Sequence, residues 1–297
     1  MIEPECFGAA LARQIEMPLP AGRQAGIWRL GQAGFAIKLG DTTAFVDVYL
    51  SNHCEAVLAR PFDHRRLSRA PLDPAEMTMA DAVLCSHDHL DHLDVPTLRT
   101  VASASPRSVA VVPEFARERM LALDWEPQRV FGTRAGDRIE VGGVEIETFP
   151  VAHESWDVDD RLGHPYQGFV LRGNSTTIVH SGDAMADDAT AEWIARAGPD
   201  LILLPINGRD SRRAMLGFAG NMNAEEAAAF ARTTGASAAV PMHYDMFAQN
   251  VDDRALERFL QACQRLGQRV IVPPLGGAIF LPLARDQASS ESAAASR

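Results

Sequence analysis

Residues 85–94 have the sequence CSHDHLDHLD, which places three of the chain's nine histidines beside three aspartates. The stretch directly follows the apolar segment AVLC, which predicts a buried strand that runs into the cluster. In a loop that leaves a strand, His87 and His89 project to the same side, whereas Asp91 and His92 lie where the chain turns into the next helix. Imidazole and carboxylate groups are the ligands that zinc, iron and manganese ions take in proteins. The stretch therefore predicts a metal site.

Three further ligand-type residues each follow another apolar segment. The segment IETFPVA precedes His153, TTIVHSG precedes Asp183, and SAAVPM precedes His243. In α/β folds the loops that leave the carboxyl ends of strands converge at one edge and build the site there. We therefore expect these three residues to join the cluster at residues 87–92.

The ligand set is large enough for two divalent ions about 3.5–4 Å apart, which can share a carboxylate and a hydroxide. The predicted ligands are His87, His89 and His153 at one ion, Asp91, His92 and His243 at the other, and Asp183 between them. Zn²⁺ and Mn²⁺ suit these ligands, and Fe²⁺ is a further candidate. The alternative is that such residues cap helices and line loops, which is what we expect of Asp94 and Asp88.

The pattern H-x-H-x-D-H after a strand resembles the metallo-β-lactamase fold of dinuclear metallohydrolases, and the later ligand-type residues come in the matching order. The resemblance runs from about Trp28 to Leu283 and implies an α/β fold, an αββα sandwich. Asp47, in AFVDVYL, matches the early aspartate that supports the site from behind the ligands, although a turn residue at a strand end is the alternative. The even composition predicts one domain over residues 1–285, followed by a disordered polar tail at 286–297.

Several local stretches are similar to the L-ascorbate-6-phosphate lactonase group and its relatives. They are WRLGQAGFAI (28–37), LDPAEMTMADAVLCSHDHLDHLD (72–94), VHSGDA (179–184), LLPINGRDS (203–211), NMNAEEA (221–227) and VPMHYD (240–245). That group hydrolyses a phosphorylated sugar lactone and typically uses Mn²⁺ or Zn²⁺. The resemblance implies a hydrolase of a lactone or similar ester, with L-ascorbate 6-phosphate among the candidate substrates.

The expected mechanism uses a hydroxide that bridges the two ions and attacks the lactone carbonyl. The second ion stabilises the developing oxyanion. Asp91 ligates one ion and could also orient the nucleophile or carry a proton, and His180 is a candidate supporting donor. For His180, a buried histidine with a purely structural role is the alternative.

A phosphorylated substrate would need a cationic clamp, and arginine offers a planar fork that suits phosphate. Arg209, Arg212 and Arg213 follow a predicted strand, whereas Arg65, Arg66 and Arg69 form the alternative clamp on the irregular loop at 52–70. Asn207 and Tyr244 are candidates to hydrogen-bond the substrate. The alternative is that the arginines pair with surface acids and that the other two residues are structural.

The composition narrows the partners that the chain could have. The net charge of −11 argues against nonspecific nucleic-acid binding, which requires a basic surface. Four scattered cysteines and the lack of a signal-peptide pattern favour reduced thiols in the cytoplasm. No apolar run approaches the ~20 residues that a membrane helix requires. We therefore expect a cytoplasmic protein with a small-molecule partner, and the resemblance suggests a homo-oligomer.

The spacing of apolar and turn residues predicts several elements. We expect a hairpin over residues 27–49 that turns at Gly40-Asp41, and an irregular stretch over 52–79. A helix over 223–234 should begin at Asn223 with an approximate capping box, and a second amphipathic helix should cover 252–266.

Two other functions compete with ester hydrolysis. The same site could hydrolyse a small-molecule or lipid phosphodiester, since related phosphodiesterases share the pattern H-x-H-x-D-H-L-D. A metal-dependent binding or sensor module without turnover is the non-enzymatic alternative. The complete ligand set favours an enzyme over that module.

Overall fold

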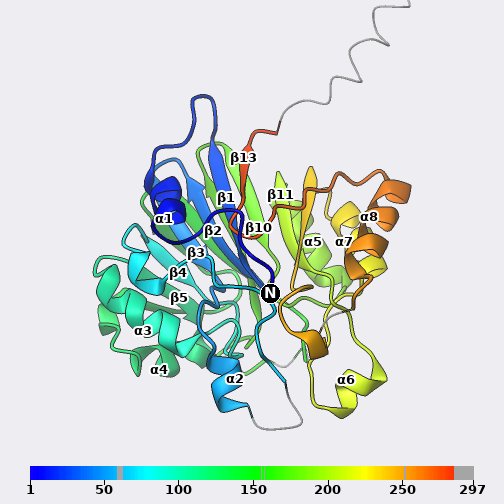
Figure 1. Ribbon diagram of the computed structural model, residues 1–297, viewed down its shortest axis with the longest axis horizontal. Helices are drawn as coiled ribbons and strands as arrows, with labels where there is room; N and C mark the ends of the chain where they lie inside the picture. The colour runs from blue at the N-terminus through cyan, green and yellow to red at the C-terminus, as the bar shows by residue number, and fades with distance from the viewer. Residues whose placement is uncertain (59–62, 155, 157, 251, 284–297) are drawn as a thin grey trace, which may run out of the picture.

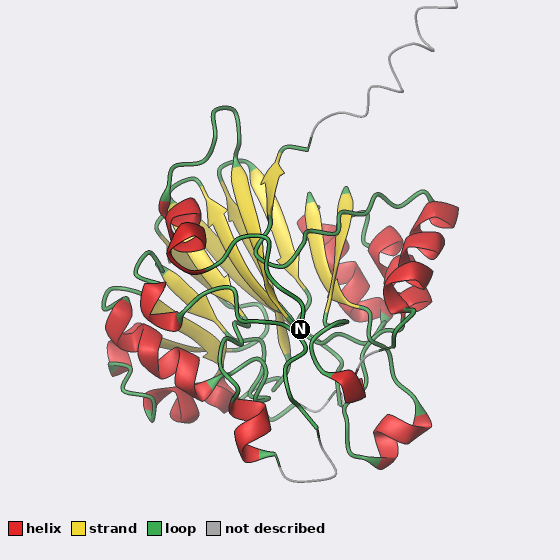
Figure 2. Ribbon diagram, viewed as in Figure 1, coloured by secondary structure: helices red, strands yellow, loops and turns green. Residues whose placement is uncertain are grey.

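The computed structural model describes residues 1–58, 63–154, 156, 158–250 and 252–283. Two β-sheets face each other, and helices cover the outer face of each sheet (Figures 1 and 2). This arrangement is the αββα sandwich that the sequence predicts. The predicted tail at 286–297 lies outside the described residues.

The described strands form one seven-stranded and one six-stranded sheet. The first sheet has the order β13 (Ala278–Leu281), β1 (Ala25–Gly31), β2 (Gly34–Leu39), β3 (Thr42–Val46), β4 (Ala82–Leu84), β5 (Val109–Pro113) and β6 (Val130–Thr133). The second has the order β12 (Ala238–Met242), β11 (Leu201–Pro205), β10 (Thr176–His180), β9 (Gln167–Gly173), β8 (Val144–Pro150) and β7 (Arg138–Val141). The described helices are α1 (Gly8–Glu16), α2 (His53–Val57), α3 (Val95–Ala104), α4 (Glu114–Leu121), α5 (Asp188–Ala197), α6 (Ser211–Met215), α7 (Ala224–Thr233) and α8 (Ala255–Leu266), with 3-10 turns at Pro74–Glu76, Pro127–Arg129 and Ala248–Asn250.

Three apolar layers hold the sandwich together. Phe35 and Ile37 of the first sheet share the central layer with Phe169 of the second. An outer layer packs α1, α3 and α4 on the first sheet, and another packs α5, α7 and α8 on the second. Because most strands are buried on both faces, their sequences are almost continuously apolar, as is typical of covered sheets.

The strand directions explain why one edge of the sandwich collects the ligand-type residues. In the second sheet, β8 and β10 are both antiparallel to β9, and β10, β11 and β12 are parallel. In the first sheet, β3 and β4 are parallel. β2 is antiparallel to its two neighbours, β1 and β3, so β1 runs in the same direction as β3 and β4. The carboxyl ends of β1, β3 and β4 therefore lie at one edge of the first sheet, and those of β8, β10 and β12 at one edge of the second. The two edges meet, because His92, which follows β4, lies 3.3 Å from Asp183, which follows β10.

The predicted hairpin over residues 27–49 was wrong in one respect. The Gly40-Asp41 turn is present, but a second turn at Gln32 and Ala33 divides the first half into β1 and β2. Gly31 and Gln32 have φ angles of 98° and 51°, so this tight turn uses left-handed backbone. The turn was missed because β1 and β2 are buried on both faces, so polar and apolar residues do not alternate regularly there, and because Gln32 is not a typical turn residue.

The helix predicted at Asn223 was confirmed, including the reciprocal capping box between Asn223 and Glu226. The helix predicted over 252–266 begins three residues later, at Ala255. All four cysteines are unpaired. None of the helices in the described ranges is both long enough and apolar enough to cross a membrane.

Candidate metal centre

The loops at the shared edge bring the ligand-type residues into one cluster. Three groups have ligand atoms within 4.8 Å of one another: His87, His89 and His153; His87, His92 and Asp183; and Asp91, His92 and His243. The first and third groups match the two ligand sets expected from the sequence. The second joins residues of both sheets around the carboxylate of Asp183.

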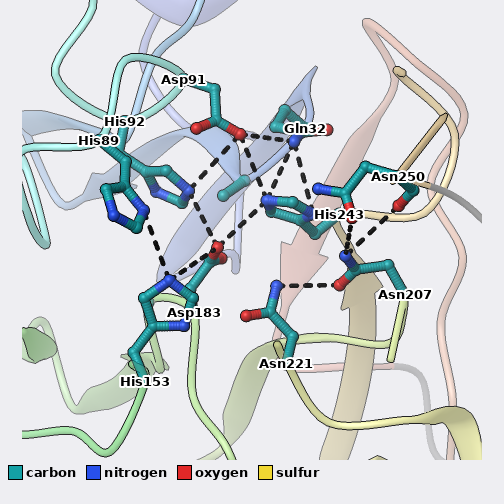
Figure 3. A network of polar contacts seen from close by, with 12 residues as sticks. Gln32, His89, Asp91, His92, His153, Asp183, Asn207, Asn221, His243 and Asn250 are labelled. Atoms are coloured by element: carbon teal, nitrogen blue, oxygen red, sulfur yellow. Dashed lines mark hydrogen bonds and ion pairs between the residues drawn. The ribbon is translucent and has the colours of Figure 1, made fainter. Parts of the chain in front are cut away.

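Asp183 lies at the centre of the cluster. Its Oδ2 is 3.3 Å from His92 Nε2, 3.2 Å from His243 Nε2 and 3.9 Å from His153 Nε2 (Figure 3). Asp91 reaches the same region, with its Oδ2 3.3 Å from His243 Nε2. Asp183 thus lies between histidines of both ligand sets expected from the sequence.

Four buried atoms of the cluster have no hydrogen-bond partner among the described residues. They are His87 Nε2, His92 Nε2, His153 Nδ1 and Asp183 Oδ1. A buried polar atom without a partner costs about 1–3 kcal/mol, so such atoms seldom gather without a reason. Imidazole nitrogens and carboxylate oxygens are good ligands for divalent cations, and the residues present therefore fit a metal centre.

Asp47 supports the cluster from behind. His92 Nδ1 lies 2.8 Å from Asp47 Oδ2, so in the neutral ring the proton is on Nδ1, and Nε2 is the atom available to a cation. Ser86 donates to the same carboxylate through its backbone N–H at 2.7 Å and its hydroxyl at 2.6 Å. A carboxylate that receives the second nitrogen of a ligand histidine fixes the tautomer and the orientation of the ring.

The electrostatics divide the histidines into two classes. Burial among other histidines lowers the pKa of His87 well below its usual value, and burial lowers the pKa of His153 to about 4. Burial opposes the charge of His243 too, but Asp183 and Asp91 outweigh it and raise the pKa to about 9. The pKa of His92 is raised for the same reason: burial opposes its charge, but Asp183 and Asp47 outweigh the burial. The metal-free cluster therefore holds protons where a cation would replace them.

Three buried residues of the site have left-handed backbone although none is glycine. The φ angles are 51° for Gln32, 48° for Asp47 and 62° for His243. Such conformations cost of order 1–3 kcal/mol each and persist where the surrounding structure enforces them. All three directly follow strands, so the sheets hold these side chains in place.

The cluster forms the floor of a cavity of about 410 Å³, the size of a small-molecule site. Part of the cavity wall is apolar and is formed by Leu58, Leu90 and Phe218. Among the described lining residues, Arg119 is the arginine. Arg119 donates from Nη1 to the backbone oxygen of Asp88 at 2.7 Å. Asp88 lies between His87 and His89 in the sequence.

Comparison with known proteins identifies the family. A family model described as "Beta-lactamase superfamily domain" matches residues 44–244. The chain belongs to this superfamily.

Relatives of known sequence place it among the UPF0173 metal-dependent hydrolases. One from Methanoculleus marisnigri is 32% identical over 62% of this chain and 76% of the relative. One from Caldivirga maquilingensis is 28% identical over 86% of this chain and 97% of the relative. A possible metal-dependent hydrolase from Veillonella parvula has the same fold, with a TM-score of 0.69 at 16% identity over 88% of this chain and all of that one.

The contacts of His180 match the structural role that the sequence left open as the alternative. His180 is fully buried and donates from Nε2 to the backbone oxygen of Ala33 at 2.8 Å. Its Nδ1 accepts the backbone N–H of Gly182 at 3.1 Å. With both nitrogens engaged in backbone contacts, His180 joins two loops and has no free group for catalysis.

The three arginines of the predicted clamp do not line the cavity above the cluster in the described chain. Arg209 forms a two-pronged ion pair with Glu226 and donates to the backbone oxygen of Asn221. Arg212 is exposed on α6, and Arg213 pairs with Asp210. None of these three arginines belongs to the described lining of that cavity, but Arg209 and Arg213 line an adjoining cavity of about 390 Å³ that shares His153, Glu154 and Phe218 with it.

The arginines of the alternative clamp also contact other residues of the chain. Arg65 pairs with Asp63, and Arg69 lies over the Phe7 ring. Arg66 donates to the backbone oxygens of Tyr49 and Ser51. These arginines organise the loop around α2 rather than the cavity.

The remaining predicted substrate residues sit beside the cavity. Tyr244 packs against the Arg29 guanidinium, 4.8 Å from the ring centre. Asn207 is buried and hydrogen-bonds Asn221 and Asn250, both of which line the cavity (Figure 3).

Sequence reasoning missed several residues that shape the site: Gln32, Ser86, Arg119 and Asn221. Gln32 donates from Nε2 to Asp91 Oδ2 at 2.7 Å and lies 2.9 Å from His243 Nε2. Gln32 was detectable by position, because it follows β1 just as the ligands follow their strands. The other three carry no comparable signal.

Proposed function

We propose that this hydrolase is a dinuclear enzyme that opens a lactone or a similar small ester. The observation that carries the proposal is the pair of ligand groups that share the surroundings of Asp183 on the floor of the cavity. In the reaction, water adds to the acyl carbon, the acyl–oxygen bond breaks and the leaving alkoxide takes up a proton.

Zn²⁺ or Mn²⁺ bound there would lower the pKa of water and polarise a carbonyl oxygen. The chain's own residues supply the geometry. His87, His89 and His153 would hold one ion, Asp91, His92 and His243 the other, and Asp183 both. Asp91, fixed by its hydrogen bond from Gln32, orients the attacking water and carries its proton to the leaving alkoxide.

The substrate is a small molecule that places its ester over the cluster and its apolar part against Leu90 and Phe218. An anionic group, such as the phosphate of L-ascorbate 6-phosphate, would bind Arg119. That guanidinium is held by a short bond to the Asp88 backbone oxygen, while the Asp88 carboxylate is 3.7 Å from it. The loose ion pair leaves room for a second carboxylate or phosphate on the planar fork.

Two measurements test the proposal. Metal analysis of the loaded protein should find two ions per chain, and proton release in a pH-stat should report turnover of lactones, phosphorylated sugar lactones or small esters. Asp91→Asn should lower kcat by at least about a hundredfold because it removes a ligand and a proton carrier. Arg119→Met should raise KM for phosphorylated lactones while plain lactones keep theirs.

Turnover confined to small phosphodiesters would keep the metal centre and overturn the ester assignment. Two bound ions without turnover of any of these compounds would favour the binding or sensor module. A single ion per chain would contradict the dinuclear site.

A further inference from the structure

Asn221 lines the cavity and has a buried side-chain oxygen without a hydrogen-bond partner among the described residues. Its side chain is 1% exposed, and the residue lines the same cavity as the metal cluster. Nδ2 donates to Asn207 Oδ1 at 2.9 Å, but Oδ1 has no hydrogen-bond partner among the described residues. Because a buried amide oxygen without a partner is costly, its presence on a cavity wall indicates a ligand.

The orientation of this amide is set by a chain of three asparagines (Figure 3). Asn207 donates from Nδ2 to the side-chain oxygen of Asn250 at 3.2 Å and to its backbone oxygen at 3.4 Å. Asn207 Oδ1 then accepts from Asn221. The amide nitrogens of Asn221 and Asn207 thus both point along the chain toward Asn250, and Asn221 Oδ1 points away from Asn207, on the side of Asp183 and His153 (Figure 3).

Arg213 prevents the chain from running in the opposite sense. Its Nη1 lies 3.3 Å from Asn250 Oδ1, and a guanidinium can only donate. Turning the three amides over would set the NH₂ group of Asn250 against this cation. It would also set Asn207 Oδ1 against the backbone oxygen of Asn250, which cannot turn.

The oxygen is also held in register with the metal centre. The backbone N–H of Met222 donates to the backbone oxygen of Ala184, the residue after Asp183, at 3.1 Å. The backbone oxygen of Asn221 accepts from Arg209 at 3.0 Å. The segment that carries Asn221 is therefore fixed to the loop that carries the central carboxylate.

From this geometry we infer that Asn221 Oδ1 accepts a hydrogen bond from a hydroxyl group of the substrate. The inference rests on the proposed function and narrows its substrates to hydroxylated lactones or esters. A neutral amide oxygen recognises a donor without requiring a charge, and a site built for a hydroxyl rejects analogues that lack it. Arg213 acts as a positioning residue through Asn250 and Asn207.

Matched substrates test the subsite. The ratio of kcat/KM for α-hydroxy-γ-butyrolactone over γ-butyrolactone should be at least about tenfold in the natural protein. In Asn221→Leu the ratio should fall toward one. Asn52→Ala, which changes an exposed asparagine outside the cavity, should keep the original ratio. Equal ratios in the natural protein and Asn221→Leu would overturn the inference.

The second pair of variants tests the orientation and covers the case in which Asn221→Leu does not fold. Arg213→Met should also reduce the ratio, because the amides are then free to turn over. Arg213→Lys, which still only donates, should restore it. If the ratio of kcat/KM for the two lactones stayed at its natural value in both Arg213→Met and Arg213→Lys, the role given to Arg213 would be contradicted.

A binding measurement separates this inference from the proposed function. Calorimetry with the metal-loaded protein should show tighter binding of 3-hydroxy-2-pyrrolidinone than of 2-pyrrolidinone, and Asn221→Leu should remove the difference. This preference without turnover of any ester would support the subsite and reject ester hydrolysis. Turnover of both lactones with no hydroxyl preference in either assay would reject the subsite alone.

Discussion

Gln32 joins the two sheets at the metal centre although it is not a typical metal ligand. It follows β1 of the first sheet, donates to Asp91 and lies beside His243 of the second sheet. Its backbone is left-handed, a conformation that persists where the surrounding structure enforces it. Residues of this kind fix the orientation of ligands, and orientation sets metal affinity.

Replacing Gln32 should therefore weaken metal binding. We expect Gln32→Ala to lower the affinity for Zn²⁺ or Mn²⁺ by about 10–100-fold, because Asp91 loses its donor. Competition with a chromogenic chelator measures the affinity. Gln128→Ala is the control, since Gln128 is exposed and bonds only to Glu126 among the described residues. Equal affinities in both variants would contradict this role.

Asp47 should matter to a similar degree for a different reason. Asp47→Ala leaves His92 Nδ1 and the Ser86 N–H without their acceptor, so the ring is no longer held in one tautomer. We expect a loss of metal affinity of about 10–100-fold. Ser86→Ala removes one of two donors from Ser86 and should cost less. A larger effect from Ser86→Ala than from Asp47→Ala would show that the assignment is wrong.

The metal ligands were predictable because their chemistry is visible in their residue types. The arginines were not, because their partners depend on tertiary structure. Arg209 follows a predicted strand in the sequence, yet in the fold it pairs with Glu226, the glutamate of the capping box of α7. Arg119 was missed for the converse reason: a surface helix delivers it to the cavity, and no local pattern records where that helix will lie.

At the level of elements, β8 combines a structural and a functional task. Its carboxyl end leads to His153, while Glu147 in its middle accepts from Arg172 of the neighbouring strand at 2.5 Å. Burial raises the pKa of Glu147, but Arg172 and Arg138 outweigh it and lower the pKa below its ordinary value. This contact should help to hold β8 and β9 in register.

The stabilisation from Glu147 should depend on pH in a definite direction. Because the folded-state pKa is depressed, the contribution is present above the ordinary value of 4.5 and is lost as the pH falls through the folded pKa. We expect Glu147→Gln to lower the free energy of unfolding by about 1–2 kcal/mol at pH 7. The difference should shrink in acid.

Urea denaturation at pH 7 and at successively lower pH measures this difference. Glu140→Gln, on the exposed side of β7, should have little effect at any pH. A constant difference between Glu147→Gln and the natural protein over the whole range would rule out the charge as its origin.

Element boundaries were harder to predict than element types. The helix at Asn223 was predicted from an approximate capping box, and the structure has both of its hydrogen bonds. The turn at Gln32 lies in a segment that is buried on both faces, so neither alternation nor polarity separates β1 from β2. Burial thus removed the signal that a solvent-exposed hairpin would have carried.

For the molecule as a whole, the metal centre is a junction between the two sheets. The first sheet supplies His87, His92 and Asp91, and the second supplies Asp183 and His243. Cations that bind only this folded arrangement stabilise it by mass action, about 2.7 kcal/mol at a hundredfold excess over Kd.

Metal removal should therefore lower the melting temperature. We expect chelation to reduce Tm by several degrees, and re-addition of Zn²⁺ or Mn²⁺ to restore it. Differential scanning calorimetry of one sample before and after chelation measures the shift. The variant Asp183→Ala, which lacks the central carboxylate, should show a much smaller response. An unchanged Tm in the natural protein would mean that the ions do not join the sheets.

The pairing of β13 with β1 has a consequence for synthesis on the ribosome. β1 begins at residue 25, but its outer partner begins at residue 278. Until residues 278–281 emerge, the growing chain carries β1 as an open edge strand of seven residues, and such edges invite pairing with neighbouring chains. β13 covers β1 and leaves a shorter edge strand of four residues, so translation that stops before it should yield a product that is more prone to aggregate.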